Sequence, residues 1–208
     1  MISASEALER LRAGNQRFAA SLGSDQVLQL HARRLGLPDR HLPFAIVLGC
    51  SDARVPAEIV FDQGLGDLFV IRVAGNIVAP SQVGSVEFAA SRFGTRLVVV
   101  LGHSQCGAID ATLEELQRPA EKQSRNLQSI VDRVRPSVEP LLATNARHDL
   151  KALARTAIRA NVTASVDHLR HGSEILEELI RQDGLRVVGA EYAVETGVVE
   201  FFDGVSSM

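Results

Sequence analysis

Short apolar runs constrain the fold of this chain more than any other feature. The segments "FAIVLG" (44–49) and "RLVVVLG" (96–102) are too short for buried helices and are bounded by turn-forming residues, so they are typical of strands buried on both faces. A third strand pattern, "DLFVIRVAG", covers 67–75, and helical patterns cover 81–93 and 107–118. Buried strands that alternate with helices predict a parallel sheet covered by helices.

The two ends of the chain add further elements. Ser3 and Glu6 have the spacing of a capping box, and apolar residues recur at helical intervals after them, which predicts an N-terminal helix. Near the other end, residues 185–202 have the pattern of two strands around a turn at Glu195–Gly197. The chain is therefore expected to begin with a helix and to end in the sheet.

The remaining segment, residues 123–183, is mostly helical in pattern, and Pro136 and Pro140 are expected to break the run. The chain shows no internal repeat, low-complexity tract or obvious linker. We therefore expect residues 1–208 to form a single α/β domain, in which a central, mainly parallel sheet is flanked by helices.

Composition excludes several classes of partner. The formal net charge of −3 argues against binding to nucleic acid or to an anionic membrane, which would need a basic surface. No window of the sequence has the roughly 20 apolar residues of a membrane-spanning helix. The first residues, "MISASEALERLRAGNQRF", lack the pattern of a signal peptide, and two cysteines make no disulfide framework. A cytoplasmic protein is the expectation.

Polar and metal-binding side chains follow two of the expected strands. Cys50, Asp52 and Arg54 come directly after the first strand, and His103 and Cys106 follow the valine-rich one. Ligand sites in open parallel sheets form beyond the carboxyl ends of the strands, so these residues are expected to converge. One imidazole and two thiolates suit zinc, and three protein ligands with an open fourth position are typical of catalytic zinc.

Two other interpretations of the cysteines stay open at this point. A buried cysteine is often only a small apolar side chain, and a single His-x-x-Cys spacing occurs often by chance. Alternatively, Cys50 could be a nucleophile in a phosphate-binding loop with Arg54. That loop would be short and has no row of glycines to supply backbone N–H groups, which disfavours it.

Three stretches carry a resemblance to a known family. "CSDARVPAE" (50–58) and "GHSQCGA" (102–108) resemble the two zinc-binding motifs of the β-class carbonic anhydrases, and "FVIRVAGN" (69–76) is similar to the stretch between them. The resemblance implies a lyase with a parallel sheet flanked by helices and one zinc ion per chain. It also implies a homodimer or homotetramer, whose N-terminal helix packs on a partner subunit.

The resemblance implies roles for individual residues. Cys50, His103 and Cys106 would be the zinc ligands, and Asp52 with Arg54 would form the Asp–Arg dyad of the family. The implied reaction is the reversible hydration of carbon dioxide to bicarbonate and a proton, by attack of zinc-bound hydroxide on CO2. In a closed form of the site, Asp52 would take the fourth zinc position itself.

Further residues would line the substrate site. The resemblance implies that the backbone N–H of Gly107 lies near the substrate, and that Phe69 and Phe88 surround CO2, partly across a subunit interface. One subgroup of the family has a bicarbonate pocket, for which Arg72 and Tyr192 occupy plausible positions.

Two positions depart from the patterns of the subgroups. Val47 stands where the subgroup with the bicarbonate pocket has a tryptophan, and this chain has no tryptophan. The other subgroup uses a glutamine as a substrate donor, and here Gly64 takes that position, one residue after Gln63. The second departure favours the subgroup whose site can close.

Two alternative functions use the same motifs. The same zinc centre could hydrolyse a CO2 analogue such as CS2 or COS, because that reaction would need the same nucleophile. A non-enzymatic zinc or bicarbonate sensor would instead keep Asp52 permanently on the metal. The sequence leaves both alternatives open beside CO2 hydration.

Overall fold

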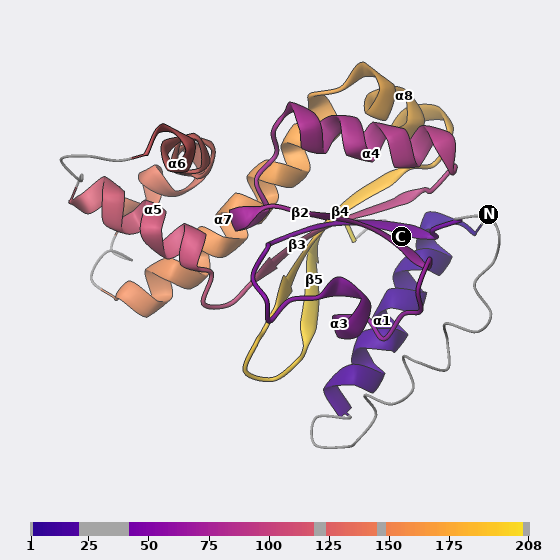
Figure 1. Cartoon of the computed structure of the whole chain (residues 1–208), viewed down its shortest axis with the longest axis horizontal. Coiled ribbons are helices and arrows are strands. Elements are labelled where there is room, and N and C mark those ends of the chain that lie inside the picture. Colours follow the sequence, from indigo (N-terminus) through magenta and orange to yellow (C-terminus); the bar gives the residue numbers. More distant parts are fainter. Residues whose placement is uncertain (1, 21–41, 119–123, 145–148, 206–208) are drawn as a thin grey trace.

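The computed structural model describes residues 2–20, 42–118, 124–144 and 149–205. One five-stranded sheet runs through this part of the chain, in the order β2-β1-β3-β4-β5 (Figure 1). Neighbouring strands are parallel, except that β5 is antiparallel to β4. The strands are β1 (Ala45–Gly49), β2 (Leu68–Arg72), β3 (Leu97–His103), β4 (Arg186–Tyr192) and β5 (Val199–Asp203). The prediction of an α/β fold with a mainly parallel sheet is confirmed.

Helices cover both faces of the sheet. Helices α1 and α3 pack on one face, α4, α7 and α8 lie on the other, and α5 and α6 pack beside α7 (Figure 1). The α-helices are α1 (Ala4–Ala20), α3 (Ala57–Val60), α4 (Pro80–Arg92), α5 (Gly107–Gln117), α6 (Arg125–Val138), α7 (Leu150–His171) and α8 (Glu174–Gln182). Two 3₁₀ segments, η3 (Ala74–Asn76) and η4 (Glu139–Ala143), complete the described elements.

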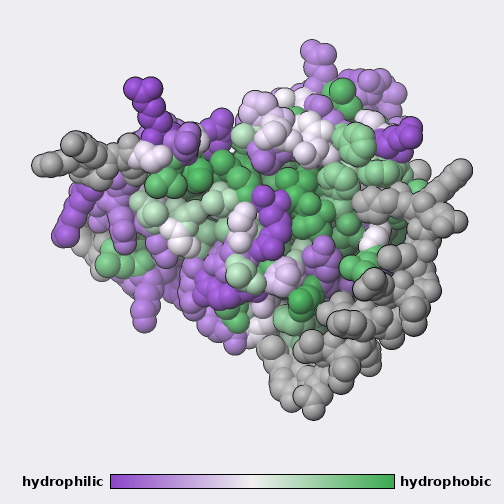
Figure 2. Space-filling model, in the orientation of Figure 1, coloured by the Kyte–Doolittle hydropathy of each residue, from purple (hydrophilic) through white to green (hydrophobic). Residues whose placement is uncertain are grey.

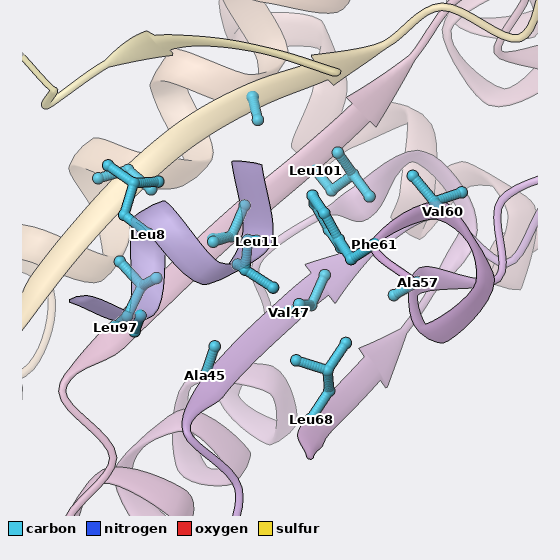
Figure 3. Packing of buried hydrophobic residues seen from close by; sticks show 14 of the residues in the cluster. Leu8, Leu11, Ala45, Val47, Ala57, Val60, Phe61, Leu68, Leu97 and Leu101 are labelled. Atoms are coloured by element: carbon cyan, nitrogen blue, oxygen red, sulfur yellow. The ribbon is translucent and has the colours of Figure 1, made fainter. Parts of the chain in front are cut away.

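The two central strands are buried along their whole length, as their apolar runs predict. Successive side chains point to opposite faces of a strand, so β1 serves two separate cores. Val47 packs toward α1 and α3 beside Leu101 and Phe61 (Figure 3), whereas Ile46 and Leu48 pack toward α4 and α7. Burial on both faces fixes the register of these strands, and it thereby fixes where their carboxyl ends lie.

The N-terminal helix begins with the predicted capping box. The Ser3 N–H donates to Glu6 Oε2 at 3.0 Å, and the Glu6 N–H donates to Ser3 Oγ at 3.2 Å. Leu8 and Leu11 are buried against the sheet of the same chain (Figure 3). Asn15 ties the helix further, since its Nδ2 donates to the carbonyl of Val60 at 3.1 Å. The apolar face of α1 thus packs on its own sheet, and the expectation that the helix also packs on a partner subunit stays a prediction.

Other sequence predictions met mixed outcomes. The turn between the last two strands is confirmed: the Gly197 N–H donates to Ala193 O at 2.8 Å, and Gly197 has a φ of 75°. Pro136 does not break the helical run, because α6 continues through it to Val138. The chain leaves α-helical geometry only after Val138, where Pro140 lies in η4. None of the helices in the described ranges is both long and apolar enough to span a lipid bilayer.

Candidate metal centre

Two strand ends and one helix start bring the three candidate ligands together. Cys50 directly follows β1, His103 is the last residue of β3, and Cys106 precedes the first turn of α5. Their ligand atoms all lie within 4.8 Å of one another, and all three residues are buried. The structure thus brings together the Cys–His–Cys group that the strand ends predict, because β1 and β3 are adjacent parallel strands.

The hydrogen bonds of His103 leave one ring nitrogen available for a metal. Its Nδ1 lies 2.8 Å from the carbonyl oxygen of Ser104, which can only accept, so Nδ1 carries the proton in the neutral ring. Its Nε2 is buried and makes no well-formed hydrogen bond with any described residue. A buried nitrogen lone pair beside two thiols is the donor set that zinc takes in proteins, so these residues fit a zinc ion.

The pKa values of the three groups are linked. Hydrogen bonding with the Cys106 thiol, with His103 as a further cause, lowers the pKa of Cys50 to about 4. The same Cys50–Cys106 hydrogen bond, together with burial, raises the pKa of Cys106. Burial acts to lower the pKa of His103, but the Cys50 sulfur outweighs it and raises that pKa. A single negative charge is therefore favoured on Cys50, where the Gly75 N–H donates to Sγ at 3.4 Å.

Asp52 and Arg54 form a tight ion pair beside the three ligands. Arg54 Nε donates to Asp52 Oδ1 at 2.9 Å and Nη2 donates to Oδ2 at 2.7 Å, while the Arg54 backbone N–H also donates to Oδ1. These hydrogen bonds hold the pKa of the Asp52 carboxyl well below its usual range. The carboxylate is therefore ionised at neutral pH and is oriented by the guanidinium, in the arrangement that the dyad prediction describes.

Arg72 and Tyr192, expected to contribute to a bicarbonate pocket, are not brought together. Arg72 Nε donates to the carbonyl of Cys50 at 3.0 Å, and its Nη2 donates to the carbonyl of Asp52. Tyr192 is buried against α1, with its ring centroid 6.4 Å from that of Phe18. Strands β2 and β4 are separated by β1 and β3, which places them about 14 Å apart. Arg72 thus supports the loop after β1, and the bicarbonate pocket stays a prediction.

Of the two positions that depart from the subgroup patterns, Val47 lies in the core and Gly64 lies in a loop beside the buried Gln63. Val47 is fully buried in β1. Gln63 is also buried: its Nε2 donates to Phe61 O at 2.6 Å, and its Oε1 accepts from Arg10 at 3.2 Å. Gly64 contributes a backbone N–H to Asp67 at 2.9 Å.

The residues expected around CO2 lie in two places. Gly107 is exposed and opens α5 directly after Cys106, where the first N–H groups of a helix have no intrahelical acceptor. Phe69 pairs in register with Ile46, about 13 Å along the sheet from Cys50. Its ring lies 6.3 Å from that of Phe88 between centroids. The two phenylalanines are therefore remote from the Cys–His–Cys group of their own chain, and their predicted role across a subunit interface stays a prediction.

Sequence reasoning missed the residues that tie Arg54 to the rest of the site. Gln105 lies between the two ligands His103 and Cys106, and its side chain and backbone carbonyls both accept from Arg54. Glu195 in the β4–β5 turn contacts the same segment. Gln105 could have been noticed from its place inside the motif, but nothing in the sequence pairs it with a residue 90 positions away.

Comparisons with known proteins agree with this geometry. The family model described as "Carbonic anhydrase" matches residues 45–199. "Carbonic anhydrase 2" of Mycobacterium tuberculosis is 35% identical over 202 residues, which cover 97% of this chain and 94% of that protein. The carbonic anhydrase of Mycolicibacterium smegmatis is 38% identical over 198 residues, covering 93% and 91% of the two chains.

A similar fold occurs among solved structures. One of them is described as a tetrameric β-carbonic anhydrase from the filamentous ascomycete Sordaria macrospora. It superposes on this chain with a TM-score of 0.67 at 22% identity, covering 95% of this chain and 97% of its own. At that level of identity the likeness concerns the fold, and it extends over almost the whole length of both chains.

Proposed function

This chain belongs to the β-class carbonic anhydrase family, a family of carbonate dehydratases, and on that premise we propose that it hydrates CO2 reversibly at a zinc ion held by Cys50, His103 and Cys106. The observation that carries the proposal is the convergence of these three buried ligand atoms within 4.8 Å of one another. His103 Nε2 supports it, because this buried nitrogen has no hydrogen-bond partner among the described residues, which is costly unless a metal takes its lone pair.

A zinc ion bound here would supply a Lewis acid that lowers the pKa of water and so provides a nucleophile near neutral pH. The chain contributes two thiolates and one neutral imidazole, which together cancel the charge of the ion. The Gly75 N–H stabilises the charge on the Cys50 sulfur, and Ser104 O fixes the tautomer of His103. These backbone contacts hold the ligands in place before any metal binds.

Asp52 would orient the reacting water. Its carboxylate is ionised and can only accept, so a water next to it must donate a hydrogen toward Asp52 and turn a lone pair away. Arg54 holds that carboxylate with two side-chain hydrogen bonds. We also propose a closed form in which Asp52 leaves Arg54 and takes the fourth ligand position, which would shut the site.

A homodimer or homotetramer fits the surface of the chain. Phe88 is 53% exposed although its ring contacts those of Phe69 and Phe93, and an aromatic cluster with an exposed member is typical of an interaction surface. Figure 2 shows apolar side chains gathered across the middle of one face, with some hydrophilic ones among them and more toward its periphery. Two thiol ligands also need a reducing compartment, for which we propose the cytoplasm.

Stopped-flow CO2 hydration by zinc-loaded protein, at pH 7 and at about pH 8.5, tests the proposal. Activity at both values would support an open site, and activity only at the higher value would support closure by Asp52. Cys50→Ser, which replaces a thiolate ligand with a hydroxyl, is expected to lose both zinc and activity.

If the protein has zinc bound but no CO2 hydration activity at either pH value, the proposed function would be refuted. Assays with CS2 and COS would then separate a hydrolase of CO2 analogues from a non-enzymatic sensor. The sensor predicts no turnover with any of these substrates.

A further inference from the structure

Glu195 binds both residues that separate two of the metal ligands. One carboxylate oxygen accepts from Ser104 Oγ at 2.8 Å, and the other accepts from Gln105 Nε2 at 2.6 Å. The Ser104 hydroxyl also accepts from the Val194 N–H at 2.9 Å. The β4–β5 turn is therefore attached to the segment between His103 and Cys106 by side-chain bonds at both of its inner positions.

Gln105 connects Glu195 to Arg54 through hydrogen bonds. Its Oε1 accepts from Arg54 Nη1 at 3.1 Å while its Nε2 donates to Glu195, so the two ends of one amide bridge the turn and the guanidinium. Its backbone carbonyl accepts from Arg54 Nη2 at 3.1 Å. Gln105 has a φ of 57°, which a residue with a side chain rarely adopts, and these contacts offset that strain.

The guanidinium of Arg54 is consequently held from two sides. Asp52 accepts from Nε and Nη2, and Gln105 accepts from Nη1 and Nη2. An exposed arginine held by one carboxylate alone keeps much of its rotamer freedom. The second set of contacts gives Arg54 one orientation, and that orientation sets where the Asp52 carboxylate lies.

We propose that Glu195 is a positioning residue for the reaction: through Gln105 it fixes the guanidinium of Arg54 and thereby keeps Asp52 in its catalytic orientation. The inference rests on the proposed function, since Asp52 matters only if it orients the reacting water. It adds a contribution from the β4–β5 turn, more than 140 residues away from the Asp–Arg dyad in the sequence.

The test compares Glu195→Ala with Glu200→Ala, each in full-length zinc-loaded protein. Glu200 is an exposed carboxylate of the same hairpin that pairs with Arg159 and has no contact with Ser104, Gln105 or Arg54 in the described structure. We expect kcat/KM for CO2 to fall about fivefold in Glu195→Ala and to stay unchanged in Glu200→Ala. Zinc content, measured on the same samples, should stay at one per chain in both.

An NMR measurement that does not depend on catalysis reports on the Arg54 side chain directly. The Arg54 Nε–H resonance, assigned by its loss in Arg54→Lys, should exchange slowly with water in the parent and in Glu200→Ala. It should exchange faster in Glu195→Ala. If the parent hydrated no CO2, the proposed function would fail, and this resonance would still report whether Glu195 restrains Arg54.

The path through Gln105 is tested by a double-mutant cycle. Gln105→Gly removes the bridging amide and suits the positive φ, so its effect comes from the lost bridge and not from backbone strain. Adding Glu195→Ala to Gln105→Gly should cause little further loss. Additive losses, or a drop in activity with an unchanged Arg54 resonance, would overturn the proposal.

Discussion

At the scale of single residues, the Asp52–Arg54 dyad has two possible roles, and only one of them requires the negative charge of Asp52. Arg54 binds both carboxylate oxygens, so the pair could be a local ion pair that only shapes the loop after β1. The same two residues could instead present an ionised acceptor next to the three ligand atoms. A substitution that keeps the shape of Asp52 and removes its charge distinguishes the two roles.

Asp52→Asn is that substitution. Its amide can still accept one hydrogen bond from Arg54, but it can donate to the reacting water and no longer enforces one orientation. We expect zinc content to be unchanged and kcat/KM for CO2 to fall by at least ~100-fold. Stopped-flow assays on protein of measured zinc content check this, with Asp52→Ala beside it. Rates close to those of the parent would make the carboxylate structural only.

At the scale of elements, the packing of α1 depends on a close approach that only glycine permits. A Cβ on residue 14 would lie 1.9 Å from the carbonyl oxygen of Phe61, which is backbone and cannot move aside cheaply. Gly84 in α4 is the matched case, because a Cβ there would meet no atom within 4 Å. The two glycines lie inside helices and differ only in what faces them.

Gly14→Ala and Gly84→Ala should consequently shift stability in opposite directions. Alanine has the higher helix propensity, so Gly84→Ala should stabilise the protein by up to about 1 kcal/mol. Gly14→Ala should destabilise it by about 1–3 kcal/mol, because α1 must move away from Phe61. Chemical denaturation curves of both variants provide the test. Equal stabilisation by the two substitutions would show that α1 does not pack as described.

The elements also show what a sequence can and cannot predict. The runs at 44–49 and 96–102 are apolar because both faces of their strands are buried, so these strands could be predicted from the sequence. The convergence of Cys50, His103 and Cys106 followed from the ends of the same strands. Pro136 was wrongly expected to break a helix, since α6 continues through it to Val138. The helical periodicity of residues 4–20 predicts that α1 has an apolar face. It does not specify which surface this face packs on, so packing on the sheet of the same chain could not be predicted.

Contacts between exposed polar side chains were beyond prediction for another reason. Glu195 approaches Gln105 because β4 lies next to β3 in register, with His103 opposite Tyr192. That adjacency is a property of the assembled sheet. Neither residue has a periodic or compositional signal that would link it to the other.

At the scale of the whole molecule, the exposed Phe88 provides a test of assembly. Phe88→Glu places a charge in the aromatic cluster with Phe69 and Phe93, and we expect it to lower the mass measured by sedimentation equilibrium toward that of one chain. Leu127→Glu is the control, because Leu127 is 58% exposed on α6, away from the cluster. If both variants kept the parent's mass, the cluster would not be a subunit interface.

The ionisation of the ligands predicts how zinc affinity depends on pH for the molecule as a whole. Zinc needs Cys106 as a thiolate, but hydrogen bonding with Cys50 and burial raise the pKa of this thiol in the metal-free protein. Cys106 must therefore lose a proton when zinc binds, whereas Cys50, with a pKa of about 4, has already lost its own above pH 6. Proton release on binding means that raising the pH favours the zinc-bound form.

The apparent zinc affinity should therefore rise by about tenfold per pH unit for each proton released, which is about 100-fold between pH 6 and pH 8 for the proton of Cys106. Competition with a chromophoric chelator of known pH dependence measures it, and calorimetry in two buffers of different ionisation enthalpy counts the protons. Cys106→Ser, which lacks this thiol, should bind zinc more weakly and with a shallower dependence on pH. An affinity independent of pH would mean that the three ligands are already deprotonated, contrary to the hydrogen bonding between Cys50 and Cys106.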